Sequence, residues 1–262
     1  MGTKPENRKV GIIGAEGRMG RAATHALLEA DGLEVVALFD VNSGEKPADK
    51  VPSFNSLSGL IEASPEVVID FTVAEASLSN LPQIAEAGIH AVVGTSGFTE
   101  ENHEFLDGVF QKSSCLIVPN FAIGAVLMMR FAELASPWFQ TGEIIEFHHN
   151  EKVDAPSGTA IATAERMLEA STEWMADPTS KETLSGTRGG DAGSNIKIHS
   201  VRMEGMVAHQ EVLLGTTGQS LLIRHDTTDR SAFMPGVVLA AQRIQGTGLT
   251  VEIGRASCRE RV

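Results

Sequence analysis

The chain has 262 residues, of which 42% are hydrophobic and 21% charged, and its formal net charge is −13. This length predicts one large domain or two modest ones, and the composition is ordinary for a globular protein with an apolar core. The negative charge argues against nonspecific nucleic-acid binding, which needs a basic surface. A small anionic substrate is compatible with it, because local cations in a cleft can outweigh a negative surface.

Targeting and redox features suggest the compartment. The sequence has no run of about 18 apolar residues, so we expect no membrane span. The first ten residues, MGTKPENRKV, lack the apolar segment of a secretory signal. Cys115 and Cys258 are the only cysteines, which favours a reducing compartment without a disulfide framework. We therefore expect a cytoplasmic protein with no membrane or nucleic-acid partner.

Short apolar runs alternate with helical patterns over the first half of the chain. The expected strands are 9–14, 33–40, 66–72, 90–98 and 115–121, and the expected helices are 18–30, 74–87 and 100–111. Strands that alternate with helices predict a parallel sheet covered on both faces.

The pattern changes near Gly124. The next expected elements are helix 125–135, strand 143–149, helix 159–170, the glycine-rich loop 185–195, strands 196–203, 209–217 and 219–227, and helix 230–245 with Pro235 near its start. The three later strands are β-branched or alternating runs with turn residues between them, which is typical of an antiparallel or mixed sheet.

A glycine turn joins the first strand to the first helix. Gly14, Gly17 and Gly20 are spaced G-x-x-G-x-x-G, and Arg18 lies within the turn. Glycine lets backbone N–H groups approach a pyrophosphate, and the helix start adds partial positive charge. Asp40 ends the next strand, where an acidic residue binds the ribose in such folds. A tight turn without a ligand is the alternative, but this context favours dinucleotide binding.

We therefore predict the α/β class, with an N-terminal Rossmann-type doubly wound parallel sheet and a smaller C-terminal α+β substrate domain containing a mixed sheet. Val41 and Asn42 follow Asp40, so no basic neighbour is present to accept a 2′-phosphate. This favours NAD(H), although Arg18 or Lys46 leaves use of NADP(H) open.

Two further segments belong to the same sheet edge. Gly94 and Thr95 belong to the end of the fourth expected strand, and Val118–Phe121 end the fifth. Ligands in open α/β sheets bind outside the carboxyl ends of the strands, so these residues are candidates for the nicotinamide side. The alternative for each segment is an ordinary loop whose glycine or proline has no role in ligand binding.

The stretch EFHHNEKVDAPSGTA, residues 146–160, has the strongest chemical pattern. Strand neighbours point to opposite faces, so His148 and Lys152, which share parity, can meet in one pocket if the strand bends. Ser157 is a good N-cap, and the N–H groups of Gly158 and Thr159 at the helix start suit a carboxylate. This set fits a small dicarboxylate with His148 as acid. The alternative is two surface histidines and a capped helix.

These segments resemble a known family. The motifs GAEGRMG, GTSGF, PNFAIGAVL and above all EFHHNEKVDAPSGTA resemble dihydrodipicolinate reductase, the 4-hydroxy-tetrahydrodipicolinate reductase of bacterial lysine and diaminopimelate synthesis. MVAHQEVLLG and RHDTTDRSAFMPGVVLA look most like actinobacterial members. The resemblance runs from about Val10 to Ile253.

The resemblance implies hydride transfer from NAD(P)H to a cyclic imine-type dicarboxylate, with protonation by the enzyme. It implies that His148 is the acid and that Lys152 binds a substrate carboxylate and assists catalysis. The other implied substrate-binding residues are His149, Ser157, Gly158 and Thr159. The implied cofactor-binding residues are Gly14, Ala15, Glu16, Gly17, Arg18, Met19, Asp40, Gly94, Thr95, Ser96, Val118, Pro119, Asn120 and Phe121; we assign no metal site.

The expected organisation follows from the same resemblance. Residues 1–122 and 233–253 form the dinucleotide-binding domain, and residues 123–232 form the domain for substrate binding and oligomerisation. The family implies a homotetramer assembled through the sheet of the second domain. Two departures are Glu151, where many members have a basic residue, and the atypical tail 254–262.

Two other functions fit parts of the pattern. A semialdehyde or homoserine dehydrogenase is the enzyme alternative, but a semialdehyde dehydrogenase needs a nucleophilic cysteine in its second domain. Cys115 precedes that domain, and Cys258 lies in the tail. A nucleotide sensor that lost its chemistry is the non-enzyme alternative, but it would not need His148, Lys152 and a helix-start anion site together.

Overall fold

The structure is a computed structural model that describes residues 7–42, 44 and 47–251. These residues form two compact units. The first unit comprises the described residues up to Phe121 and from Phe233 onward, and the second comprises Ala122–Ala232. The first boundary thus falls before Ala122, one residue earlier than the sequence suggests. Lys46 and the tail 254–262 lie outside the described residues.

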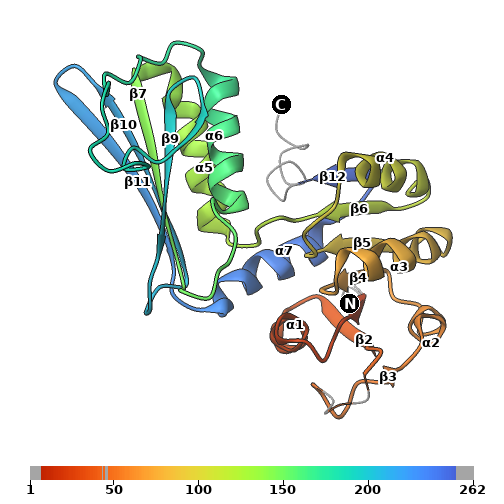
Figure 1. Ribbon diagram of the computed structural model, residues 1–262. Coiled ribbons are helices and arrows are strands. Elements are labelled where there is room, and N and C mark those ends of the chain that lie inside the picture. The colour runs from red at the N-terminus through yellow and green to blue at the C-terminus, as the bar shows by residue number, and fades with distance from the viewer. Residues whose placement is uncertain (1–6, 43, 45–46, 252–262) are drawn as a thin grey trace, which may run out of the picture. The chain divides into compact units, whose positions relative to one another are not determined.

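A seven-stranded parallel sheet forms the centre of the first unit (Figure 1). Its strand order is β12-β6-β5-β4-β1-β2-β3, and all neighbouring strands are parallel. The strands are β1 (Arg8–Ile13), β2 (Leu33–Phe39), β3 (Ser53–Phe54), β4 (Val67–Asp70), β5 (His90–Val93), β6 (Ser114–Ile117) and β12 (Gly248–Val251). β4 and β6 are buried along their whole length, as expected for a sheet covered on both faces.

Helices cover the two faces of this sheet. They are α1 (Arg18–Glu29), α2 (Leu57–Glu62), α3 (Ala74–Glu86), α4 (Glu100–Val109) and α7 (Met234–Arg243), the last preceded by the short helix η2 (Arg230–Phe233). On one face, Leu60, Leu81 and Leu106 from α2, α3 and α4 share an apolar cluster with Ile13 of β1. On the other face, α1 and α7 pack against each other (Figure 1).

The strand order places a switch point between β1 and β4. From β1 the sheet continues to β2 and β3 on one side, and to β4, β5 and β6 on the other. In doubly wound sheets, ligands bind beyond the carboxyl ends of the strands at such a point. Gly14 and Phe71 follow these two strands, so they mark where a dinucleotide would be held.

The second unit contains a five-stranded mixed sheet in the order β11-β10-β7-β9-β8. Its strands are β7 (Thr141–His148), β8 (Gly190–Gly193), β9 (Ile196–Arg202), β10 (Ala208–Thr216) and β11 (Gln219–Thr227). β7 runs parallel to β9, and the other neighbouring pairs are antiparallel. Helices α5 (Ile123–Ala135) and α6 (Gly158–Ala170) lie side by side along one face, with the short η1 (Ser136–Trp138) after α5 (Figure 1).

The central strand β7 alternates between buried and partly exposed residues. Ile144 and Glu146 are fully buried, whereas Glu143 and Phe147 are partly exposed. Residues two apart in a strand share a face, so His148 lies on the same face as Glu146. A carboxylate and an imidazole therefore stand next to each other at the end of the strand.

One strand lies inside the glycine-rich segment predicted as a loop. β8 pairs with β9 through a turn in which Ser194 and Asn195 both have positive φ. β8 is an exposed edge strand held by main-chain pairing, so it has no apolar alternation that would reveal it in the sequence. Over the described residues, no helix is long and apolar enough to cross a membrane.

Candidate functional site

The glycine turn after β1 is closely packed. Gly14 has φ of +75°, and a Cβ atom on Gly20 would lie 2.1 Å from the Gly14 carbonyl oxygen, so only glycine fits at Gly20. Helix α1 then begins at Arg18, with Gly17 as an N-cap that provides no side-chain hydrogen bond. The turn thus presents main-chain N–H groups and the positive end of a helix, which suits a pyrophosphate.

Asp40 lies beside this turn. Its Oδ2 accepts a hydrogen bond from the main-chain N–H of Glu16 at 3.0 Å, and its Oδ1 accepts one from that of Asn42 at 3.0 Å. The carboxylate of Glu16 in turn accepts from the N–H of Gly44 at 2.7 Å. Two carboxylates are therefore grouped where the ribose-binding acid was predicted.

The ends of β4, β5 and β6 continue the same edge. A Cβ atom on Gly94 would lie 2.3 Å from the Phe71 ring and 2.8 Å from the Phe121 ring, and these rings lie 5.6 Å apart between centroids. The side chain of Thr95 is buried and donates to the carbonyl of Thr72 at 3.1 Å. Gly94, Thr95 and Phe121 are thus brought together, whereas Ser96 and Pro119 are exposed.

Asp70, the last residue of β4, holds the residues at this edge through buried hydrogen bonds. It is fully buried and accepts hydrogen bonds from Thr72 Oγ1 at 2.6 Å and Ser77 Oγ at 2.8 Å. Burial raises the pKa of Asp70 despite these hydrogen bonds. Phe71 and Thr72 were not predicted as site residues. The position of Thr72 just beyond a buried parallel strand was the signal for them.

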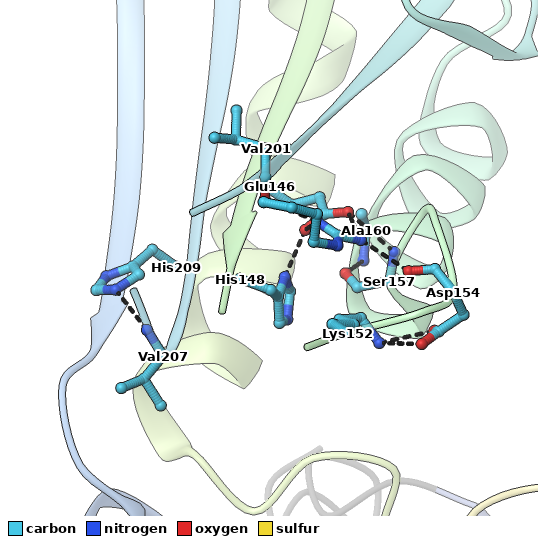
Figure 2. Close-up of polar contacts among 10 residues, drawn as sticks. Glu146, His148, Lys152, Asp154, Ser157, Ala160, Val201, Val207 and His209 are labelled. Carbon is cyan, nitrogen blue, oxygen red and sulfur yellow. Dashed lines mark hydrogen bonds and ion pairs between the residues drawn. The ribbon is translucent and has the colours of Figure 1, made fainter. Parts of the chain in front are cut away.

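In the second unit, a polar cluster joins the end of β7 to the start of α6 (Figure 2). Glu146 contacts His148 Nδ1 and forms two hydrogen bonds of 2.9 Å with Arg202 on β9. The Ser157 N–H donates to Glu146 at 3.3 Å, and the Ser157 hydroxyl caps α6 by accepting from the Ala160 N–H at 3.2 Å.

The loop after β7 brings Lys152 to the same region (Figure 2). Lys152 Nζ lies 2.7 Å from both carboxylate oxygens of Asp154, and the pKa of Asp154 is lowered chiefly by this hydrogen bond. Arg202 donates to the main-chain carbonyl of Asp154 at 2.8 Å, which ties the loop to the Glu146 cluster. His149 is exposed, and its side chain takes no part in the contacts of Glu146, Lys152 and Arg202 described above.

The arrangement offers an imidazole, an ammonium and a capped helix start within one small region. This combination suits a small anionic substrate that must also receive a proton. Glu146 and Arg202 were not predicted as site residues. Glu146 could have been predicted, because it lies two residues before His148 and therefore on the same face of the strand. Arg202 could not, because only the pairing of β7 with β9 places it beside Glu146. Within the described part of the chain, no group of three or more His, Cys, Asp or Glu residues is arranged to hold a metal ion.

Comparisons with known proteins agree with this architecture. Residues 8–121 match the family model described as dihydrodipicolinate reductase, N-terminus, and residues 124–253 match that described as dihydrodipicolinate reductase, C-terminus. The 4-hydroxy-tetrahydrodipicolinate reductase of Mycobacterium marinum is 45% identical over 94% of this chain and 97% of its own length. That of Corynebacterium urealyticum is 43% identical over 93% and 96%.

A solved structure gives the same result. Dipicolinate-bound dihydrodipicolinate reductase from a Paenisporosarcina species is 36% identical, with a TM-score of 0.83 over 95% of this chain and 99% of that one. The N- and C-terminal family models together account for nearly all the described residues. The chain therefore belongs to the dihydrodipicolinate reductase family.

Proposed function

We propose that the protein reduces 4-hydroxy-tetrahydrodipicolinate to tetrahydrodipicolinate with NAD(P)H in diaminopimelate and lysine biosynthesis. The carrying observation is the cluster of His148, Lys152 and the Ser157-capped helix, in the part of the chain that matches the family's C-terminal model. The relatives that match over nearly their full length bear this activity in their names.

The first unit is proposed to hold the cofactor. The glycine-only packing at Gly20 and the uncapped start of α1 fit a pyrophosphate, and Asp40 fits a ribose. The full proposed set is Gly14, Ala15, Glu16, Gly17, Arg18, Met19, Asp40, Gly94, Thr95, Ser96, Val118, Pro119, Asn120 and Phe121. When bound, the nicotinamide supplies the hydride.

NADH is proposed as the preferred cofactor, with NADPH also accepted. A 2′-phosphate would approach the carboxylates of Asp40 and Glu16, which repel it. Arg18 is exposed at the helix start, where it offers a phosphate-binding cation. The preference is therefore set by a balance of nearby charges rather than by steric exclusion.

The second unit is proposed to hold the substrate. Lys152 would bind one carboxylate, the start of α6 at Ser157, Gly158 and Thr159 would bind the other, and His148 would donate the proton that the reduction consumes. His149 is retained as a proposed substrate contact, since its exposed ring is available to a ligand. The reaction balances as substrate, NAD(P)H and one proton yielding product, NAD(P)⁺ and water.

The decisive assay is oxidation of NADH with freshly generated substrate. We expect oxidation that depends on the substrate and is inhibited by dipicolinate, and that is lost in His148→Gln. If wild-type protein oxidises NADH no faster with substrate than without it, the proposal fails. Activity with a semialdehyde or homoserine instead would favour the other dehydrogenases, and nucleotide binding without any turnover would favour a sensor.

A homotetramer is also proposed. The face of the mixed sheet opposite α5 and α6 carries Leu213 and Leu222, both exposed, beside the charged pair Glu211–Arg224. Burial of such a face against other copies would remove these exposed apolar side chains from water. A cytoplasmic location is proposed because the 262-residue chain has only two cysteines, too few for a disulfide framework, and Cys115 is a buried free thiol.

A further inference from the structure

Glu146 is the most deeply buried acidic side chain in the proposed substrate site. Its side chain has no solvent exposure, and it lies on the central strand β7. A buried carboxylate is costly unless it is well paired and hydrogen-bonded. Here the partners come from three different elements: His148 on β7 itself, Arg202 on β9, and the Ser157 N–H at the start of α6.

The contact with His148 fixes which ring nitrogen is available. An ionised carboxylate only accepts hydrogen bonds, so the Nδ1 atom that it contacts must carry the proton. Nε2 is then the ring atom left for a substrate, and it is the atom that gains or loses the second proton. Glu146 and His148 lie on the same face of one strand, so this contact holds the ring in one orientation.

Glu146 is ionised at neutral pH. Burial raises its pKa, but hydrogen bonds from His148, Arg202 and Ser200 outweigh burial and lower it to about 2. The bidentate Arg202 guanidinium balances the buried charge. The same guanidinium holds the main-chain carbonyl of Asp154, beside the Lys152 ammonium. The carboxylate thus connects all three parts of the proposed site.

We propose that Glu146 is a positioning residue that holds His148 with Nδ1–H directed into the protein, so that Nε2 is presented to the substrate. This inference rests on the proposed function of His148 as the proton donor. Through Arg202 and Ser157, Glu146 also keeps the Lys152 loop and the start of α6 in place around the histidine. The competing explanation is that Glu146 and Arg202 form a purely structural ion pair, and that the contact with His148 is incidental.

The tautomer of His148 distinguishes these explanations. In protein labelled with ¹⁵N only at histidine, long-range proton–nitrogen correlations show which ring nitrogen carries the proton when the imidazole is neutral. The His148→Gln spectrum assigns the signal among the eight histidines of the chain. We expect the Nδ1–H tautomer in the wild type. A wild-type His148 with its proton on Nε2 overturns the proposal, whatever the variants do.

The variant Glu146→Gln tests the consequence. It removes the charge while keeping the shape, so we expect loss of the fixed tautomer and a fall of kcat of at least about tenfold. A catalytic histidine deprived of its orienting carboxylate can lose about 10⁴-fold. KM should change less than kcat. A variant that folds, loses activity and keeps the Nδ1–H tautomer would make Glu146 structural only.

Glu143→Gln is the matched control. Glu143 lies on the opposite face of the same strand and also contacts a histidine and an arginine. His199 Nε2 lies 2.5 Å from its carboxylate, and one nitrogen of Arg188 lies 2.5 Å from it. The same substitution there should leave the His148 tautomer and kcat unchanged. A fall in kcat of Glu143→Gln equal to that of Glu146→Gln would show a general effect of weakening β7 and would overturn the proposal.

A second variant covers the case in which Glu146→Gln does not fold, since breaking a buried ion pair is strongly destabilising. Glu146→Asp keeps the negative charge that balances Arg202 and withdraws the carboxylate by one methylene from all its partners, including His148. We expect it to fold and to lose the fixed tautomer; an unchanged tautomer with full kcat contradicts the proposal. The tautomer measurement needs no substrate, so failure of the proposed reaction and failure of this inference are distinguishable.

Discussion

Lys152 holds Asp154 through both carboxylate oxygens, each 2.7 Å from Nζ. Asp154 is the more exposed partner, with 65% of its side chain accessible, compared with 19% for Lys152. An exposed carboxylate of the protein thus pairs with the ammonium that we propose as the binding partner of a substrate carboxylate. Substrate binding would have to displace Asp154 from this position.

Removal of that internal competitor should strengthen ligand binding. We expect Asp154→Asn to bind dipicolinate about two- to fivefold more tightly in calorimetry, since an exposed ion pair contributes up to about 1 kcal/mol. The control is Asp191→Asn, which breaks the similar surface pair with Lys197, 2.9 Å apart, outside this cluster. Weaker binding by Asp154→Asn would instead mean that Asp154 helps to shape the site.

Substitution of the two proposed catalytic residues, His148 and Lys152, should have different effects on kcat and KM. His148→Gln should mainly lower kcat, by the roughly 10²–10⁴-fold typical of a lost general acid. Lys152→Ala removes a charge that would contact the substrate in both ground and transition states, so it should raise KM and also lower kcat. Lys152→Arg should keep only part of the activity that Lys152→Ala loses, because a forked guanidinium does not replace a compact ammonium.

Steady-state kinetics and NADH binding together test this pair of expectations. NADH affinity should be unchanged in these variants, because the glycine turn and Asp40 belong to the other unit. His199→Gln provides the control for loss of a partly buried histidine paired with a glutamate. If folded His148→Gln keeps more than about a tenth of wild-type turnover, His148 is not the general acid, because that loss is below the expected range.

The lowered pKa of Glu146 also predicts a pH dependence of stability. The pKa is about 2 in the folded protein, below its ordinary value of 4.5. A depressed pKa gives stability that is fully present above about pH 4.5 and is lost as the pH falls toward 2. The free-energy difference of unfolding between wild type and Glu146→Gln should therefore shrink over that range, as measured by urea denaturation. A constant difference would show that the carboxylate's charge contributes no stability.

Much of this molecule could be predicted from local pattern. The parallel sheet follows from short apolar runs between helices. The position of the glycine turn could be predicted because no residue with a side chain fits at Gly14 or Gly20. Edge strand β8 could not be predicted, since its residues Gly190–Gly193 are paired through the main chain and have no apolar periodicity.

The candidate site was predictable only where its residues are close in sequence. His148, Lys152 and Ser157 belong to one motif. Arg202 lies 56 residues after Glu146 and reaches this cluster only through the pairing of β9 with β7. No periodicity in the sequence encodes that pairing partner. The pairing of Lys152 with Asp154 was likewise hidden, because it depends on the path of the loop rather than on residue type.

Oligomeric state tests the proposed role of the exposed sheet face. We expect light scattering at micromolar concentration to give the mass of a tetramer. Leu222→Asp, on that face of β11, should shift the mass toward smaller species, because a buried unpaired charge is costly at an interface. Leu184→Asp, at an exposed leucine outside the sheet, is the control. A monomeric wild type would refute the tetramer, unless removal of residues 254–262 restored it.

We propose that cofactor choice depends on the carboxylates of Asp40 and Glu16, which lie at the glycine turn. Asp40→Ala should selectively weaken NADH, because it removes the proposed partner of the ribose hydroxyls. Glu16→Gln should act differently. The amide oxygen can still accept from the Gly44 N–H, but the negative charge beside the 2′ position disappears. NADPH should then bind about three- to tenfold more tightly while NADH changes little, since partly exposed charges a few ångströms apart interact by about 1 kcal/mol.

Dissociation constants for both cofactors, measured by fluorescence titration at low and high salt, would test these changes. The gain for NADPH in Glu16→Gln should diminish at high salt, because screening weakens the repulsion that the wild-type charge exerts. Glu29→Gln removes the same charge at the last residue of α1, about 18 Å along the helix from its start and beyond the screening length, so its cofactor affinities should match wild type. A strong wild-type preference for NADPH, or equal gains for both cofactors in Glu16→Gln, would show that these carboxylates do not set the choice.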